Sequence, residues 1–246
     1  RCLRIPLLSL LLVAAFALPA SAINYGWYLE SGEGWVDNAA LWYAPEGTTG
    51  VIPGGADWGI IKTVGVMKMD AASLGNTGWT SEAPLLRMYV GDGLTTTGLY
   101  PVAASEGHVL QTGGTFYVKD YLIIGYGGPA GTASSYDITG GSIVQTNGNS
   151  IRIGDRTTGT MTATGTEMAP VNVSSNVTRV GSGAAGNGTL TLNGYVNWAA
   201  TTGGFQIGAG GAGVNGTVNL NDHAVVTTAG TTYIANSVSG SEGTLN

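Results

Sequence analysis

Two short segments set the pattern of this sequence: Thr178-Arg179-Val180-Gly181 and Gly188-Thr189-Leu190-Thr191-Leu192-Asn193-Gly194. In each segment apolar and polar side chains alternate, and a glycine-rich stretch separates the two. Alternation with a period of two is typical of a β-strand that buries one face. Glycine supplies the backbone freedom that tight corners need. The stretch therefore predicts two strands joined by a corner.

Both segments recur at a nearly constant spacing. The first segment ends at residues 125, 154, 181, 208 and 235, so successive copies lie 29, 27, 27 and 27 residues apart. The second segment recurs in the same order, and a weaker third strand follows it in each copy. Such self-similarity indicates a repeat architecture. The copies of the second segment are Gly159–Gly165, Gly188–Gly194, Gly216–Asn221 and Gly243–Asn246.

One repeat alone cannot bury its apolar side chains, but stacked repeats can. The predicted fold class is all-β: a right-handed parallel β-helix (β-solenoid) with about 27 residues and three strands per coil. In this fold Ile153, Val180, Ile207 and Ile234 form one interior column. An antiparallel β-sandwich is the main alternative, although that fold does not require the same inward pattern every 27 residues.

The chain divides into four predicted regions. Residues 1–22 are a signal peptide, 23–65 an N-terminal cap with the first irregular coils, 66–120 irregular β coils, and 121–246 the regular solenoid. Within the irregular part, Met88-Tyr89-Val90-Gly91 is a candidate for one further coil, 34 residues before Gly125. A cap is expected because an uncovered sheet edge promotes aggregation.

The N-terminal residues resemble a secretory signal. Arg1 and Arg4 precede an apolar run over residues 7–18, and Pro19-Ala20-Ser21-Ala22 provides a cleavage site with small residues. We therefore expect a secreted or cell-surface protein whose mature form lacks Cys2, the single cysteine. The sequence has no initiator methionine and stops inside a repeat, so we expect it to be part of a longer chain.

The segments Gly34-Trp35-Val36-Asp37 and Leu41-Trp42, together with the copy at Gly188–Gly194, resemble secreted bacterial β-solenoid surface proteins. They are similar to the autotransporter-associated β-strand-repeat and PEP-CTERM-type proteins. The resemblance covers roughly residues 24–65 and 121–246. It implies a secreted or surface location, and it implies no catalytic residues for this chain.

Four residues are candidate ligand-binding residues. Arg152 and Arg179 are predicted to stack on one outward face in neighbouring coils, where an anion such as an acidic glycan could bridge them. Asp155 could equally pair with one of the two. Tyr195, aligned with His223, and the outward Tyr233 could stack on sugar rings, or they could pack against neighbouring side chains.

The sequence predicts no catalytic residues, no metal site and no cofactor. Its glycine-rich corners match the dinucleotide fingerprint, but the helix that the fingerprint requires does not follow. Some β-solenoids cleave polysaccharides with paired carboxylates. The candidate acids of the regular coils are Asp137, Asp155, Glu167 and Asp222, which do not recur from coil to coil.

The charge composition limits the kinds of molecule that the chain is expected to bind. The chain carries 15 acidic and 9 basic residues among 246, which argues against binding nucleic acid. We expect no membrane span after the signal peptide. The predicted function is a non-catalytic structural or adhesive solenoid, with extracellular polysaccharide or cell-surface components as partners. The open last coil could also pair with another copy. The alternative is a carbohydrate-active enzyme on the same scaffold.

Overall fold

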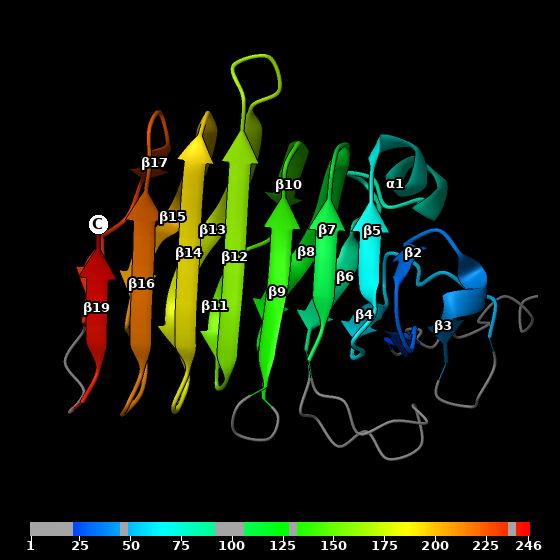
Figure 1. Ribbon diagram of the computed structural model, residues 1–246, viewed down its shortest axis with the longest axis horizontal. Coiled ribbons are helices and arrows are strands. Elements are labelled where there is room, and N and C mark those ends of the chain that lie inside the picture. Colours follow the sequence, from blue (N-terminus) through cyan, green and yellow to red (C-terminus); the bar gives the residue numbers. More distant parts are fainter. Residues whose placement is uncertain (1–21, 45–48, 92–105, 128–131, 236–239) are drawn as a thin grey trace, which may run out of the picture.

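The computed structural model describes residues 22–44, 49–91, 106–127, 132–235 and 240–246. It is all-β, with 56% strand and 5% helix, and it winds into a β-solenoid of about six turns with about 28 residues per turn. Figure 1 shows the strands of successive coils side by side from the N-terminal to the C-terminal end. The predicted fold class is confirmed. The predicted signal peptide lies outside the described residues, except for Ala22.

Two sheets form the walls of the solenoid. The 11-stranded sheet has the path β17-β15-β13-β10-β8-β6-β4-β1-β3, with β11 and β18 paired beside it. Its strands are β1 Asn24–Trp27, β3 Trp42–Tyr43, β4 Trp58–Ile61, β6 Leu85–Val90, β8 Thr115–Ile124, β10 Gly141–Gln145, β11 Ser150–Asp155, β13 Val171–Ser182, β15 Val196–Ile207, β17 Val225–Thr228 and β18 Tyr233–Ile234.

The second sheet has eight strands in the order β19-β16-β14-β12-β9-β7-β5-β2. Between the named strands every pairing is parallel except that of β1 with β3, which is antiparallel. The strands of this sheet are β2 Glu33–Trp35, β5 Val66–Met69, β7 His108–Gln111, β9 Ala133–Ile138, β12 Thr158–Gly165, β14 Asn187–Gly194, β16 Asn215–Leu220 and β19 Glu242–Leu245.

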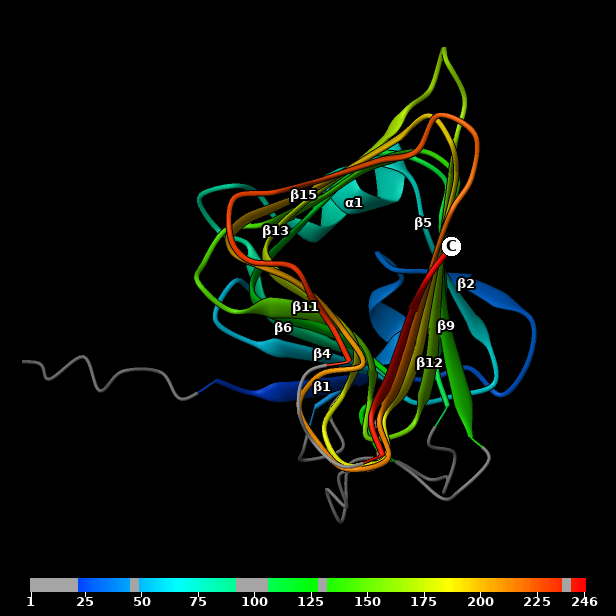
Figure 2. The ribbon, with the colours of Figure 1, turned by 90° about the vertical axis from the view of Figure 1, so that its left-hand side faces the viewer.

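The coils stack in register, and their backbones overlay when the solenoid is viewed along its length (Figure 2). Ile153 pairs with Val180, Val180 with Ile207, and Ile207 with Ile234. The first three are at most 1% exposed. The predicted interior column is therefore confirmed, and each buried aliphatic side chain contributes roughly 1.5–3 kcal/mol to the core.

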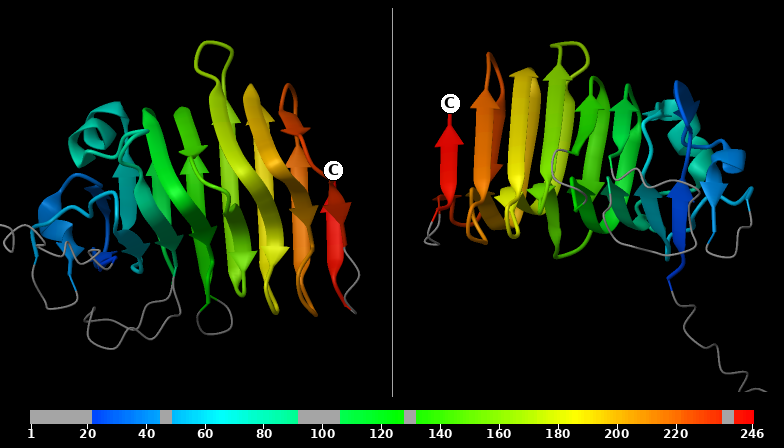
Figure 3. Two further views of the ribbon diagram at one scale, coloured as in Figure 1. Left: turned by 180° about the vertical axis from the view of Figure 1, so that it is seen from behind. Right: turned by 60° about the horizontal axis from the view of Figure 1, so that its bottom comes forward.

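The third strand of one coil and the first strand of the next are joined into single long strands in three places. β8 contains 10 residues and pairs with both β10 and β11. β13 and β15 each contain 12 residues and bend at a corner (Figure 3). β13 pairs with both β10 and β11, which are separate strands in the preceding coil. Each coil thus has the three predicted extended segments. The number of named strands per coil is smaller where two of these segments pair without a break at the corner.

The strands β1 to β6, in the described parts of the N-terminal region, belong to the same two sheets as the regular coils. β1 pairs with β4, β4 with β6, and β6 with β8. Val90 lies in register with Ile124, which confirms that Met88–Gly91 opens a further coil. Beyond this coil, the division between cap and irregular coils stays a prediction.

Two short helices, absent from the predicted pattern, lie in the N-terminal coils: η1 Ala39–Leu41 and α1 Ala71–Thr77. Asp70 begins α1 by accepting a hydrogen bond from the Ser73 backbone N–H at 2.7 Å, and the Ser73 hydroxyl accepts one from the Asp70 N–H at 2.9 Å. This reciprocal pair is a capping box. Among the described helices, none has the length and apolar character needed to span a membrane.

Candidate functional site

A column of outward side chains runs along the 11-stranded sheet. Arg152 lies in register with Ile123 on one side and with Arg179 on the other. The column continues through Gln206 to Tyr233 on the next two coils. Adjacent strands in a sheet lie about 4.8 Å apart, so the two guanidinium groups project from neighbouring coils, as predicted.

Aromatic rings occupy the same face toward the N-terminal coils. The ring of Tyr89 lies 5.6 Å from that of Trp58 and 5.2 Å from that of Tyr126. The guanidinium carbon of Arg87 lies 4.6 Å from the Trp58 ring and 5.1 Å from the Tyr121 ring. We call this surface the arginine–aromatic face. It consists of Trp58, Arg87, Tyr121, Tyr126, Arg152, Arg156, Arg179, Gln206 and Tyr233, and it covers the buried Tyr89 and Ile123.

The arginine–aromatic face contains a hollow of about 290 Å³. We call it the arginine hollow. Its lining residues come from β11, β13, β15 and the corners that follow them. They are Arg152, Asp155, Arg156, Arg179, Ser182, Gly183, Gln206, Ala209 and Gly210.

Positive charge dominates the arginine hollow. It holds three of the seven Lys and Arg residues that the structure describes, in a chain of net charge −6. Asp155 is 2% exposed and balances one of them. Its carboxylate accepts a hydrogen bond from the Ser182 hydroxyl at 2.7 Å and lies 3.2 Å from Nη1 of Arg152. With the residues that the structure describes, Arg156 and Arg179 form no salt bridge.

Arg179 is the least satisfied of the three cations. Its Nε is buried and has no hydrogen-bond partner among the described residues. Burial lowers the pKa of Arg179, and the like charge of Arg152 lowers it further, while Asp155 and Tyr121 oppose the shift. The side chain stays charged at neutral pH, because arginine does not deprotonate in proteins. A buried charged donor without a partner is costly.

The backbone of Arg156 is strained. Its φ is +85°, in the left-handed region that glycine tolerates best. The stacking register aligns it with Gly127, Gly183 and Gly210, all of which have positive φ. A left-handed conformation costs a non-glycine residue roughly 1–2 kcal/mol. Arginine thus stands where the neighbouring coils carry glycine, and its guanidinium carbon lies 4.9 Å from the Tyr126 ring.

The four predicted ligand-binding residues do not all come together. Arg152 and Arg179 line the hollow, and Tyr233 lies on the same column, 39% exposed. Tyr195 lies at a different corner, after β14, where its ring stacks on His223 at 4.6 Å between centroids. This contact confirms the predicted alignment of Tyr195 with His223. A role in binding stays a prediction for all four residues.

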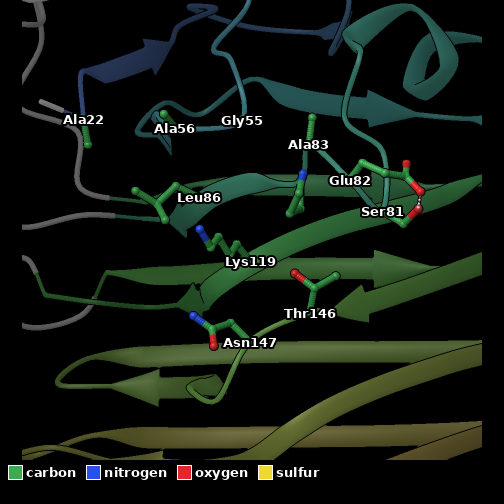
Figure 4. Close-up of a pocket in the computed structure, with 11 residues that line it drawn as sticks. Ala22, Gly55, Ala56, Ser81, Glu82, Ala83, Leu86, Lys119, Thr146 and Asn147 are labelled. Carbon is green, nitrogen blue, oxygen red and sulfur yellow. Dashed lines mark hydrogen bonds between the residues drawn. The ribbon is translucent and has the colours of Figure 1, made fainter. Parts of the chain in front are cut away.

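A larger hollow of about 730 Å³ lies at the corners of the first coils (Figure 4). Its walls are mostly small side chains and backbone. Its charged side chains are Glu82, which accepts a hydrogen bond from Ser81 at 2.7 Å, and Lys119 on the opposite wall. Because no set of polar groups converges here, this hollow is a weaker candidate site than the arginine hollow.

Carboxylate chemistry finds little support in the described residues. Two carboxylates are buried, Asp120 and Asp155, and each pairs with an arginine. Asp155 aligns with Tyr126, which follows Asp120 by six residues and lies beyond the positive-φ corner at Gly125. Nowhere in the described ranges do three His, Cys, Asp or Glu residues form a group that could hold a metal.

The sequence pattern did not identify Arg156 or the aromatic part of the face. Arg156 lies two residues beyond the repeated strand, in a corner without alternating character. Aligning the corners would have shown one arginine among glycines. Trp58, Arg87 and Tyr121 lie in coils of irregular length, where the repeat gives no register.

Comparison with models of protein families, with curated protein sequences and with solved structures finds no match for this chain.

Proposed function

We propose that this chain is part of a non-catalytic, secreted or cell-surface β-solenoid with a structural and adhesive role, and that its arginine–aromatic face binds polysaccharide. The observation that carries the proposal is the outward column in which Arg152, Arg179, Gln206 and Tyr233 follow one another on consecutive coils. Aromatic rings that stack on sugars and arginines that bind polar substituents are both present on this face.

The architecture supports the structural role. Each coil pairs with its neighbours through parallel strands in both sheets, and aligned apolar side chains fill the interior. Such a stack is a quasi-one-dimensional rod with an extended surface. We therefore propose a spacer or display stalk, similar to the autotransporter-associated β-strand-repeat and PEP-CTERM-type surface proteins.

The experiment is affinity electrophoresis of residues 23–246 through gels that contain neutral or acidic polysaccharides. We expect at least one polysaccharide to retard the protein. We also expect Tyr233→Ala, on the column, to reduce retardation more than Tyr195→Ala, at the other corner. If no polysaccharide retards the protein, the adhesive role is wrong.

A parallel assay addresses the alternative, a polysaccharide lyase or glycoside hydrolase. The same polysaccharides are incubated with the protein, and the products are assayed for new reducing ends and for unsaturated sugars. We expect neither product. Steady product formation that the purified protein catalyses, and that substitution of Asp155 abolishes, would establish the enzyme instead.

A further inference from the structure

We propose that the arginine hollow binds the oxyanion group, sulfate or carboxylate, of an acidic polysaccharide. The inference rests on the proposed function and names the class of ligand for the same face. Three arginines, Arg152, Arg156 and Arg179, line the hollow, and Asp155 is the one acidic residue among its described lining residues.

Arginine donors from neighbouring coils lie close together at the hollow. Arg152 is held in place by its own partners: its Nε donates to the Ser150 hydroxyl at 2.9 Å, and its Nη1 lies 3.2 Å from the Asp155 carboxylate. Arg179 projects from the neighbouring strand with its Nε unpartnered by any described residue. Guanidinium groups present paired N–H donors that match the geometry of carboxylate and sulfate oxygens. An oxyanion between the two coils would complete this set.

Arg156 adds a feature that does not depend on the column of Arg152 and Arg179. Arg156 occupies a left-handed backbone position that is glycine in the coils before and after it. Strained residues of this kind cluster at functional sites. The adjacent Gly183 leaves space for the arginine, because a Cβ on Gly183 would lie 2.9 Å from Cγ of Arg156. The third positive charge therefore sits in a corner where glycine alone would suffice to form the coil.

The surroundings favour a substituent on a polymer over a free ion. The hollow has a volume of about 290 Å³ and adjoins Gln206 on the next coil. Tyr233 extends the column by one more coil. On the other side, the Tyr121 ring lies 4.9 Å from the guanidinium carbon of Arg152. An anionic group in the hollow thus has a polar and aromatic surface on both sides for the rest of a sugar chain.

The test is isothermal titration calorimetry of residues 23–246 with dextran sulfate, polygalacturonate, neutral dextran and inorganic sulfate. Arg156→Gly removes one cation and installs the glycine of the neighbouring coils, so we expect it to fold with an unchanged or higher melting temperature. Lys119→Gln removes one exposed cation outside the hollow and is the matched control. Arg179→Gln removes the unpartnered guanidinium.

We expect dextran sulfate, polygalacturonate or both to bind more tightly than neutral dextran. Arg156→Gly and Arg179→Gln should each weaken that binding by about tenfold or more, and Lys119→Gln should leave it within about twofold. Binding of dextran sulfate alone identifies sulfate as the ligand, and binding of polygalacturonate alone identifies carboxylate.

Other outcomes separate this inference from the proposed function. If neutral dextran binds as tightly as the acidic polymers, or if Lys119→Gln weakens binding as much as Arg156→Gly, the inference is wrong and the adhesive function stands. If no polymer binds but inorganic sulfate does, with the same dependence on Arg156, the oxyanion site stands and the polysaccharide-binding function is wrong.

Discussion

At the scale of single residues, glycine determines how closely the coils approach. Gly125, Gly154, Gly181 and Gly208 follow the first strand of successive coils, and each has a φ between 64° and 75°. A Cβ on Gly154 would lie 2.2 Å from the Asn187 carbonyl oxygen. No change of rotamer relieves this contact, because the backbone fixes the position of the Cβ and the carbonyl oxygen is itself a backbone atom. The glycine is therefore required by conformation and by space together.

We predict that Gly154→Ala lowers the free energy of unfolding by at least about 2 kcal/mol, from the left-handed backbone and the close contact. Gly148→Ala is the control, because its Cβ would meet nothing within 4 Å and its φ is not positive. That change should stay within about 0.5 kcal/mol. Urea unfolding measures both, and equal effects would contradict the argument.

A buried tyrosine makes stability depend on alkaline pH. Tyr136 is fully buried and its hydroxyl donates to Oε1 of Gln111 at 2.7 Å. Burial raises the pKa of Tyr136 well above its usual value of 10. The unfolded chain therefore releases this proton at a lower pH than the folded protein does. The stabilisation is fully present below pH 10 and is lost as the pH rises further.

We predict that the free energy of unfolding falls less steeply above pH 10 in Tyr136→Phe than in the unchanged protein. At pH 7 the variant should be less stable by about 1–3 kcal/mol, because the buried Oε1 of Gln111 loses the hydroxyl that donates to it. Denaturant unfolding between pH 7 and 11 measures both effects. Parallel pH profiles above pH 10 would show that another group causes the loss.

The residue scale also shows how far the sequence could predict the site. Arg152 and Arg179 occupy equivalent places in strands that repeat, so counting residues was enough to bring them together. Arg156 lies where glycine is expected, and strand periodicity does not extend into that corner. The aromatic residues of the face depend on pairings between coils of unequal length, such as Arg87 with Tyr121, which only the folded chain defines.

At the scale of elements, the interior columns carry the stability of the stack. The column of Ile153 is closed on both sides by the neighbouring coils, and Ile153 is fully buried. Ile234 has the same place in its own coil, on β18, and is 49% exposed. The sequence predicted that both side chains point inward, because alternation determines the face. It could not predict their burial, which depends on the neighbours.

We predict that Ile153→Ala costs about 2–5 kcal/mol, because it leaves a cavity in a closed column. Ile234→Ala makes the same chemical change at the half-exposed position and should cost less than about 1.5 kcal/mol. Chemical denaturation of the two variants provides the comparison. Similar losses of unfolding free energy in the two variants would mean that burial by neighbouring coils does not determine the contribution of these side chains.

At the scale of the whole molecule, each coil is stabilised by the coil on either side. The described residues at the C-terminal end include Val225, Ile234 and Leu245, which are 48%, 49% and 49% exposed, while most of the interior is fully covered. In a stack governed by contacts between nearest neighbours, a coil with one neighbour opens more readily than a coil with two. Local stability should therefore be graded along the solenoid.

We predict that amide hydrogen exchange is slowest in β11, β12 and β13 and fastest in β17, β18 and β19. Mass spectrometry of peptides from residues 23–246 can resolve this gradient. Val180 and Ile234 occupy equivalent positions in the same column. Their exchange rates can therefore be compared directly. Uniform protection along the ladder would indicate that the chain unfolds as a single cooperative unit.

The glycine column around Arg156 has a consequence for how such a molecule could change over generations. Any glycine codon becomes an arginine codon through one nucleotide substitution. Gly183 has a φ of 68°, close to the 85° of Arg156, whereas Gly127 and Gly210 have φ values of 132° and 120°. A positive charge could therefore move from Arg156 to the next coil, but it could not be duplicated there without a shift, because Gly183 leaves the space that Arg156 occupies. The spacing of positive charges along this face could then change while the geometry of the coils stays the same.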